Sequence, residues 1–283
     1  MTRLLGLYRE PECSPGRHQS NDTLLLEAVA ERLGARGLAL ALTDIDRVAA
    51  PPRGVALVLS MCQGPAALER LLEWEAQGVR ILNSPRAALN TYRVRLPELM
   101  RSAGVPYPAT RLIPTAGDID VPADLADGVW LKRGDVHASV PADVQRVRSA
   151  RALREGRAGL AARGVATAAV QAHRDGDEVK FYAVGDGAFF HWFYPGPSRG
   201  YAFRPEDLSA LAALAAGAAG LEIYGGDAIV SPDGDLTLID LNDWPSFAPC
   251  RHAAADAIAE HVTRTADAAW NRPLVSSTNE SAV

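Results

Sequence analysis

Short apolar runs alternate with segments of helical spacing over the first 85 residues. The runs that predict strands are Leu4–Tyr8, Leu38–Leu42, Gly54–Cys62 and Val79–Leu82, and those that predict helices are Thr23–Leu33 and Ala66–Ala76. Strands and helices that alternate in this order are typical of βαβ units, which build a parallel sheet. The pattern therefore predicts a small parallel-sheet domain over residues 1–85.

A long polar loop, Arg9–Asn21, separates the first predicted strand from the first helix. Loops of this length in compact domains are often functional, and parallel sheets bind ligands where strands end. Arg9, Ser14, Arg17 and His18 are therefore candidates for binding an anionic substrate. The alternative is a loop that is merely solvated.

The pattern changes after residue 85. A helical stretch from Arg86 to about Ala103 ends at Gly104, with prolines beyond it, which is how helices commonly stop. Strands and helices then mix without a βαβ order, so the fold class is α/β followed by α+β. The predicted division is a connecting helix at 86–104, two lobes at 105–170 and 171–272, and a polar tail at 273–283.

The sharpest local feature is a predicted hairpin. Its strands, Asp227–Val230 and Leu236–Leu241, are joined by the turn sequence Ser-Pro-Asp-Gly. Folding brings Asp227 close to Asp240 and Asn242, and strand alternation puts the last two on one face. Oxygen ligands of this kind suit Mg²⁺. The alternative is that these groups cap the hairpin or pair with a buried base.

Composition narrows the function classes. The formal net charge is -5, with acidic and basic residues scattered along the chain, which argues against nucleic acid as a partner. No apolar run reaches the length of a bilayer span or of a signal peptide, so we expect a cytoplasmic protein without a membrane partner. Three widely spaced cysteines, Cys13, Cys62 and Cys250, predict free thiols.

The order of these pieces, from about Asn83 to Arg264, resembles the ATP-grasp superfamily. This superfamily includes glutathione synthetase, D-alanine ligases, glutamate-adding peptide ligases and inositol trisphosphate kinases. The resemblance implies a two-lobed ATP-grasp domain after the N-terminal domain, with ATP and Mg²⁺ as cofactors. Its metal-binding acidic residue and acidic-x-Asn motif are matched by Asp227 and by Asp240 and Asn242, with Asp where Glu is commoner.

Two basic residues of the family hold the nucleotide phosphates. The resemblance assigns these roles to Arg93, which precedes the family-like segment GVPYPAT, and to Lys132 at the end of VWLK. Arg93 stands where the family usually has Lys, and its forked guanidinium can still hold an α-phosphate oxygen.

The segment AAVQAH matches the adenine-binding hinge, so Gln171, Ala172 and His173 are the implied adenine residues. Ala172 replaces the Glu that usually follows Gln there, which leaves Glu178 or Asp175 as the ribose partner.

EVKFYAVGD places Lys180 where the family carries a cation toward the transferred phosphate, which makes it the implied catalytic residue. The loop after Lys132 has few glycines, whereas many relatives close a Gly-rich lid over the phosphates. His137, Ser139 or backbone N–H groups are the candidates to replace that lid.

The leading hypothesis is a ligase that joins a small-molecule carboxylate to an amine through an acyl phosphate, releasing ADP and phosphate. The first alternative is a kinase of a small polyol or inositol phosphate, because VKFYAVG and DLNDWPSF resemble segments of the inositol phosphate kinases. The second is a nucleotide-binding regulatory protein without catalysis. Relatives are often dimers, so a homodimer is possible.

Overall fold

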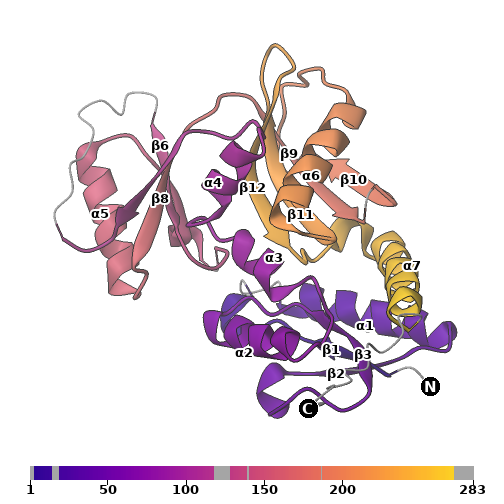
Figure 1. Ribbon diagram of the computed structural model, residues 1–283. Helices are drawn as coiled ribbons and strands as arrows, with labels where there is room; N and C mark the ends of the chain where they lie inside the picture. Colours follow the sequence, from indigo (N-terminus) through magenta and orange to yellow (C-terminus); the bar gives the residue numbers. More distant parts are fainter. Residues whose placement is uncertain (1–2, 15–18, 118–127, 139, 186, 271–283) are drawn as a thin grey trace, which may run out of the picture.

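The protein is described by a computed structural model over residues 3–14, 19–117, 128–138, 140–185 and 187–270. Three four-stranded sheets follow one another along this part of the chain (Figure 1). The predicted tail, and the candidates Arg17, His18 and Ser139, lie outside the described residues. The predicted fold class, α/β followed by α+β, is confirmed, and the predicted boundaries at residues 85, 104, 170 and 272 stay predictions.

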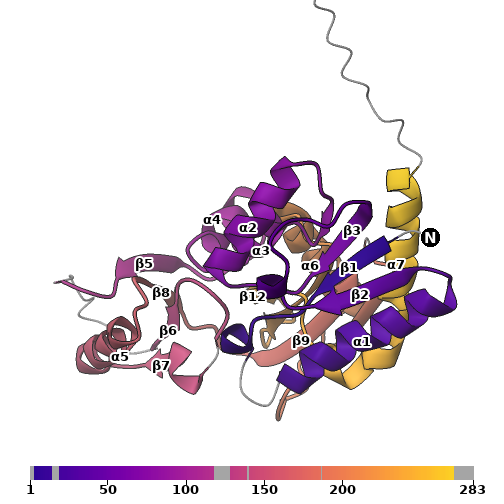
Figure 2. The same ribbon diagram turned by 90° about the horizontal axis from the view of Figure 1, so that it is seen from below.

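The N-terminal sheet is parallel throughout, as the βαβ pattern predicts. Its order is β2-β1-β3-β4. Helices α1 and α2 lie on opposite faces of this sheet (Figure 2). Side chains that alternate along the strands therefore enter two different cores: Leu4 packs with residues of α1, and Leu5 packs with residues of α2. The elements are β1 (Arg3–Leu7), α1 (Gln19–Ala35), β2 (Ala39–Thr43), β3 (Val55–Ser60), α2 (Pro65–Ala76) and β4 (Ile81–Leu82).

The connector differs from the single helix predicted over residues 86–104. It consists of two short helices, α3 (Pro85–Asn90) and α4 (Leu96–Ser102). In one continuous helix the ring of Pro97 would press against the carbonyl of Arg93, so the helix breaks before the proline. The break leaves Arg93 between the helices with its side chain buried beside the last sheet.

The middle lobe is an antiparallel sheet in the order β5-β8-β6-β7, covered on one face by α5. Leu131 of β6 packs against Leu153 and Leu160 of α5. Strand alternation therefore turns Trp130 and Lys132 to the other face. The elements are β5 (Thr110–Pro114), β6 (Val129–Arg133), β7 (Val144–Val147), α5 (Ala150–Ala162) and β8 (Thr167–Ala172), of which β7 was not predicted.

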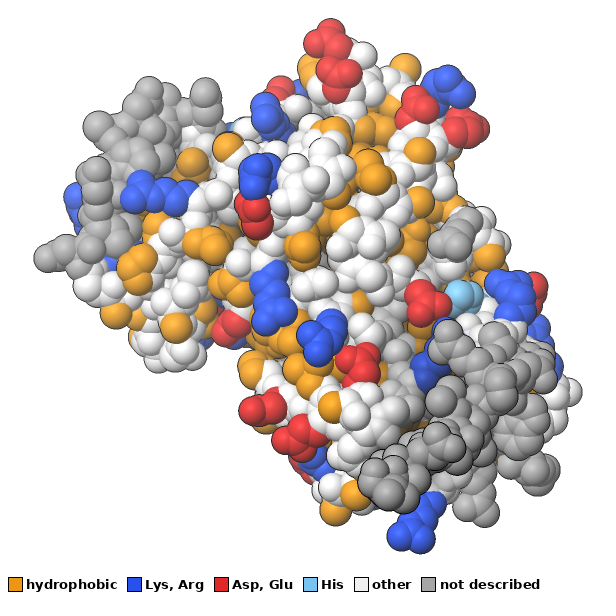
Figure 3. All heavy atoms as spheres, viewed as in Figure 1, with side chains coloured by type: hydrophobic (Ala, Val, Ile, Leu, Met, Phe, Trp, Pro, Cys, Tyr) orange, Lys and Arg blue, Asp and Glu red, His pale blue; other side chains and the backbone are white. Residues whose placement is uncertain are grey.

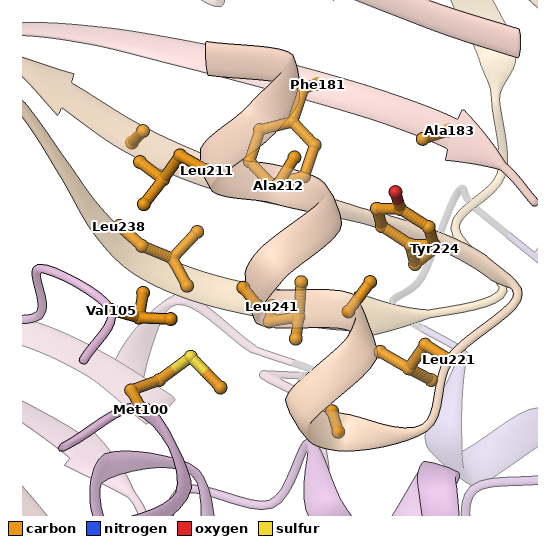
Figure 4. Close-up of a cluster of buried hydrophobic side chains, with 14 of the residues drawn as sticks. Met100, Val105, Phe181, Ala183, Leu211, Ala212, Leu221, Tyr224, Leu238 and Leu241 are labelled. Carbon is orange, nitrogen blue, oxygen red and sulfur yellow. The ribbon is translucent and has the colours of Figure 1, made fainter. Parts of the chain in front are cut away.

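The last sheet is antiparallel, in the order β10-β9-β11-β12. Helix α6 covers one face, where Leu211 packs in one cluster with Phe181, Leu238 and Leu241 (Figure 4). The residues that alternate with these, Lys180 among them, face the other way. The elements are β9 (Asp177–Val184), β10 (Phe189–Phe193), α6 (Pro205–Ala219), β11 (Ile223–Val230), β12 (Leu236–Asp243) and α7 (Arg251–Trp270).

Helix α7 ties the end of the described chain to its beginning. Ala254 and Ile258 of α7 share one core with Leu25 and Leu26 of α1. This core also includes Ile223 at the start of β11, so the N-terminal domain and the last sheet are packed together.

Acidic and basic side chains are interspersed over the face seen in Figure 3. Cys13, Cys62 and Cys250 are free thiols, as predicted. None of the helices within the described ranges combines the length and the apolar character needed to cross a membrane.

Candidate active site

Three charged side chains form a row across the last sheet. Lys180 of β9 pairs in register with Asp227 of β11, which pairs in turn with Asp240 of β12. Residues directly opposite each other in antiparallel strands point to the same face, so all three side chains lie together, away from α6. Asn242, two residues beyond Asp240, shares this face. The predicted hairpin therefore brings Asp227, Asp240 and Asn242 together.

Each carboxylate of the row is paired with one cation. Lys180 contacts Asp227 Oδ1, and Arg93 contacts Asp240 Oδ2 from the connector. Burial alone would raise the pKa of Asp240, yet Arg93 and then Lys132 hold this pKa down at about 2. At Asp227 burial outweighs the attraction of Lys180 and raises the pKa of the carboxyl. The charges at the centre of the site thus depend strongly on one another.

A β-bulge in the hairpin links this row to the middle lobe. The pairing of β11 with β12 shifts between Asp227 and Ala228, which leaves Ile239 without a direct partner in the ladder. Its carbonyl instead accepts hydrogen bonds from Lys132 Nζ at 3.1 Å and Gln171 Nε2 at 3.5 Å. The bulge therefore joins the two residues predicted to hold phosphate and adenine to the strand that carries Asp240.

Lys132 is nearly fully buried, with 5% of its surface exposed. Burial is the largest cause that lowers the pKa of its ammonium to about 8, and Arg93 lowers it further against the attraction of Asp240. A cation held in this way gains from any anion that enters beside it.

A cavity of about 290 Å³ opens between the uncovered faces of the middle and last sheets. Trp130, Ile229 and Ile239 give it apolar walls, and Trp130 Nε1 donates to His173 Nδ1 at 3.2 Å. The sequence analysis did not identify these three apolar residues, although strand alternation along VWLK places Trp130 on the same face as Lys132. All six residues predicted to bind the nucleotide line this first cavity: Arg93, Lys132, Gln171, Ala172, His173 and Glu178.

The two candidates for the ribose partner are separated by the structure. Glu178 lines the first cavity, where burial, and then the charge of Asp227, raise the pKa of its carboxyl. Asp175 is instead bound to the guanidinium of Arg199 at 3.1 Å. The geometry favours Glu178.

A second cavity, of about 260 Å³, adjoins the first and extends toward the N-terminal domain. Arg93, Asp227 and Asp240 line both cavities, so the paired carboxylates stand where the two meet. Lys180 and Asn242 line only the second cavity. His137 also lines it, and burial, followed by the nearby arginines, lowers the pKa of its imidazole to about 3, so the ring is neutral.

Arg9 does not match either prediction for the first long loop, because it is neither a free anion ligand nor a solvated side chain. Its guanidinium donates to the carbonyls of Met61 at 3.3 Å and Trp244 at 2.6 Å, and it lies 3.4 Å from Asp22. Ser14 also donates to Asp22, at 2.9 Å. Arg9 therefore fastens the loop to two strand ends beside the second cavity, and Ser14 fastens it to Asp22 in the first turn of α1.

Asp243, which sequence reasoning did not single out, is fully buried in the wall of the second cavity. Asn83 donates to its Oδ1 at 2.5 Å, while its Oδ2 has no partner among the described residues. Burial raises the pKa of this carboxyl to about 7 in spite of the bond from Asn83. In the sequence Asp243 looks like an ordinary acid at a strand end, and only the packing of Asn83 and Gln63 around it sets it apart.

The residues of the row fit a magnesium ion. Asp240 Oδ1 is buried and has no hydrogen-bond partner within the described ranges. There, no group of three His, Cys, Asp or Glu side chains is placed to hold a metal, so the side chains that could hold one at this place are Asp227, Asp240 and the amide of Asn242. Mg²⁺ commonly takes one or two carboxylates and completes its shell with water and phosphate oxygens.

No protein-family model matches the sequence, and no curated protein matches it. Solved structures match the fold. The D-alanine–D-alanine ligase of Bacillus anthracis, solved with ATP, has a TM-score of 0.68 at 10% identity, over 95% of this chain and 99% of the ligase.

Two further structures agree. A RimK-domain ATP-grasp protein of Sphaerobacter thermophilus has a TM-score of 0.66 at 18% identity, over 93% of this chain and 100% of its own. PsnB, an ATP-grasp ligase solved with a minimal precursor, Mg and ADP, has a TM-score of 0.61 at 18% identity, over 94% of this chain and 98% of its own.

Proposed function

We propose that this chain, which has the ATP-grasp fold, binds Mg-ATP and joins a small carboxylate to an amine, releasing ADP and phosphate. One observation carries the proposal: the row of Lys180, Asp227 and Asp240 stands where two cavities meet. One cavity then serves the nucleotide and the other the acceptor, with the charged row between them.

The first cavity suits a nucleotide. Trp130 and Ile239 offer apolar surface to a base, and Glu178 offers a carboxylate to a ribose hydroxyl. Lys132 Nζ donates to the carbonyl of Ile239, and the other N–H groups of its ammonium can reach phosphate oxygens. We therefore assign the phosphates to the end of the cavity that holds Lys132 and Arg93.

Asp227, Asp240 and Asn242 would hold Mg²⁺. When bound, this ion neutralises charge on the phosphates as phosphoryl transfer proceeds. Lys180, next to Asp227 and open to the second cavity, would stabilise charge on the transferred phosphoryl group. Positioning and charge stabilisation account for most of the catalysis in such transfers, so a separate base is not required for this step.

The reaction has two steps. A carboxylate oxygen attacks the γ-phosphorus, the bond to the β,γ-bridging oxygen breaks, and ADP leaves. The amine nitrogen then attacks the acyl carbon, phosphate leaves with the electron pair of the C–O bond, and the nitrogen loses a proton. The charges of the second cavity support this ligase over a kinase of polyphosphates, because its cations Arg9, Arg93 and Lys180 are each already paired with a carboxylate.

The test is Mg²⁺-dependent ATP turnover with pooled carboxylic acids, amines and polyols, with ADP separated from AMP. ADP and phosphate that form only when an acid and an amine are both present support the ligase. Lys180→Met should lower this turnover by about 100-fold or more, whereas Asp207→Asn, which changes an exposed acid on α6, should leave it unchanged.

Other products would support other functions. A phosphorylated polyol would identify a kinase, and ATP binding without turnover in any pool would favour a regulatory role. A chain that fails to bind Mg-ATP at all would refute the proposal.

A further inference from the structure

The charges that line the second cavity do not balance. Its described lining holds four carboxylates and three permanent cations. The cations are used up in ion pairs: Arg9 with Asp22, Arg93 with Asp240, and Lys180 with Asp227. His137 adds no charge, because burial first, and then the neighbouring arginines, lower the pKa of its ring to about 3. Asp243 is therefore left as the carboxylate without an ion-pair partner among the described residues.

Asp243 is also held rigidly. Its Oδ1 accepts from Asn83 Nδ2, and the same amide group donates to the carbonyl of Ile223. Asn83 is fixed in turn, because its Oδ1 accepts the backbone N–H groups of Glu222 and Ile223 at 2.8 and 3.0 Å. The free oxygen, Oδ2, cannot turn away to find a partner elsewhere without breaking this set.

A second unpartnered oxygen lies in the same wall. Gln63 is 2% exposed and lines the second cavity, and its Oε1 has no partner among the described residues. Its other groups are occupied: Nε2 donates to the carbonyl of Asp243 at 3.2 Å, the backbone N–H donates to Glu10, and the carbonyl accepts from Tyr92. Gln63 and Asp243 thus each present one fixed, buried acceptor.

Buried acceptors without donors are costly, and a buried carboxylate without a cation is more so. A protonated primary amine corrects both defects, because it supplies a positive charge and three N–H donors in a small volume. A hydroxyl supplies a donor but no charge. A quaternary ammonium supplies the charge but no donor.

We propose that the second cavity binds the ammonium group of a primary amine, with Asp243 Oδ2 and Gln63 Oε1 as its acceptors. The identification of this amine as a substrate rests on the ligase function proposed above, whereas the binding itself does not. The substrate in this cavity is then an amino compound such as an amino acid or an alkylamine, rather than an alcohol or a thiol. It binds as the ammonium and must give one proton to solvent before its nitrogen can attack the acyl carbon.

The experiment titrates the ¹⁵N-labelled full-length chain, with Mg²⁺ and ADP present, with three probes of similar size. These are n-propylammonium, tetramethylammonium and n-propanol, and binding is followed by amide chemical shifts. In the wild type we expect n-propylammonium to bind and the other two probes to bind at least about tenfold more weakly.

The variants separate charge from structure. Asp243→Asn keeps the shape of the side chain and should weaken n-propylammonium binding about tenfold or more. Gln63→Met should weaken it less. Asp44→Asn makes the same chemical change at an exposed acid that pairs with Arg47, and should leave the affinity unchanged.

Equal affinity of n-propylammonium for the wild type and Asp243→Asn would overturn the inference. So would equal binding of tetramethylammonium, or no binding of n-propylammonium by a sample that binds Mg-ADP. Thermal unfolding adds a readout of structure: removal of an unpaired buried charge should leave the midpoint unchanged or higher, whereas a purely structural Asp243 predicts a lower midpoint with unchanged probe affinity. Failure to bind Mg-ATP would count against the proposed function alone.

Discussion

Replacement of Asp240 by asparagine tests the charge network at the centre of the site. The substitution keeps the shape of the side chain and removes its charge. Arg93, which is 4% exposed, then loses the carboxylate that it contacts. Lys132 also loses an attraction that now favours its charge. The expected result is a less stable protein that no longer binds Mg-ATP productively.

The size of the stability loss follows from the pKa of Asp240. Arg93 first, and then Lys132, overcome the effect of burial and lower this pKa from 3.8 to about 2. At about 1.36 kcal/mol per pKa unit this corresponds to about 2–3 kcal/mol in favour of the charged form. The substitution also leaves a buried cation unpaired, and breaking a buried ion pair in this way usually costs about 3–5 kcal/mol. The loss in free energy of unfolding should therefore be at least the value from the pKa and at most about 5 kcal/mol.

The pH dependence has a defined sign. A carboxyl whose folded pKa is lowered stabilises the protein above its unfolded pKa, and this contribution is lost as the pH falls through the folded value. The gap in free energy of unfolding between wild type and Asp240→Asn should therefore be full at pH 7. It should shrink as the pH falls below 3.8 toward about 2.

Urea unfolding followed by tryptophan fluorescence, with EDTA present to remove metal, measures this gap. Asp207→Asn serves as the control and should stay within about 0.5 kcal/mol of the wild type. A gap below about 1 kcal/mol at pH 7, or one that does not shrink in acid, would show that the ion pair is not the main partner of Asp240.

Three further outcomes are expected. Lys180→Met should lower ATP turnover by about 100-fold or more, while the Kd of Mg-ATP, measured by calorimetry, changes much less. A loss of Mg-ATP affinity as large as the loss of turnover would contradict a role of Lys180 in phosphoryl transfer. Gly226→Ala should cost about 1–3 kcal/mol in urea unfolding, since its new Cβ would lie 2.6 Å from a backbone carbonyl and a phenylalanine ring. Gly217→Ala, in open space on α6, should instead stabilise the protein by up to about 1 kcal/mol. Asp177 accepts hydrogen bonds from three backbone N–H groups of residues 199–201, which lower its pKa against the effect of burial. The free energy of unfolding of Asp177→Asn should therefore fall less than that of the wild type as the pH drops below 3.8. An equal fall in both proteins would refute this account.

The hairpin was predictable from local sequence alone, whereas one detail of its pairing was not. Its turn residues and the two-residue alternation of its strands were enough to predict that Asp227, Asp240 and Asn242 come together, and the structure brings them together. The bulge at Ile239 was not predictable in the same way. It is set by the pairing of one strand with another, and nothing in the composition of either strand requires it.

The role of Arg93 shows a different limit. The sequence indicated a basic residue before a helix stop, but predicted one helix where Pro97 divides two. The family resemblance implied that Arg93 holds a phosphate, which stays a prediction, and it did not indicate the contact of Arg93 with Asp240 that the structure shows. Both features depend on where the connector lies against β12, which is a contact between distant segments of the chain.

The sequence by itself predicted the parallel N-terminal sheet and the hairpin that carries Asp227 and Asp240, because periodicity and turn chemistry act over a few residues at a time. The residues that line the first cavity were instead implied by the resemblance of short motifs to a known superfamily. Only the tertiary structure decided that Arg9 is fastened to Asp22, that Asp243 is left without a cation, and that Gln63 presents its free oxygen in the same wall. Such charge balances are set by segments that are far apart in the sequence, because burial and pairing depend on which side chains share one enclosed volume.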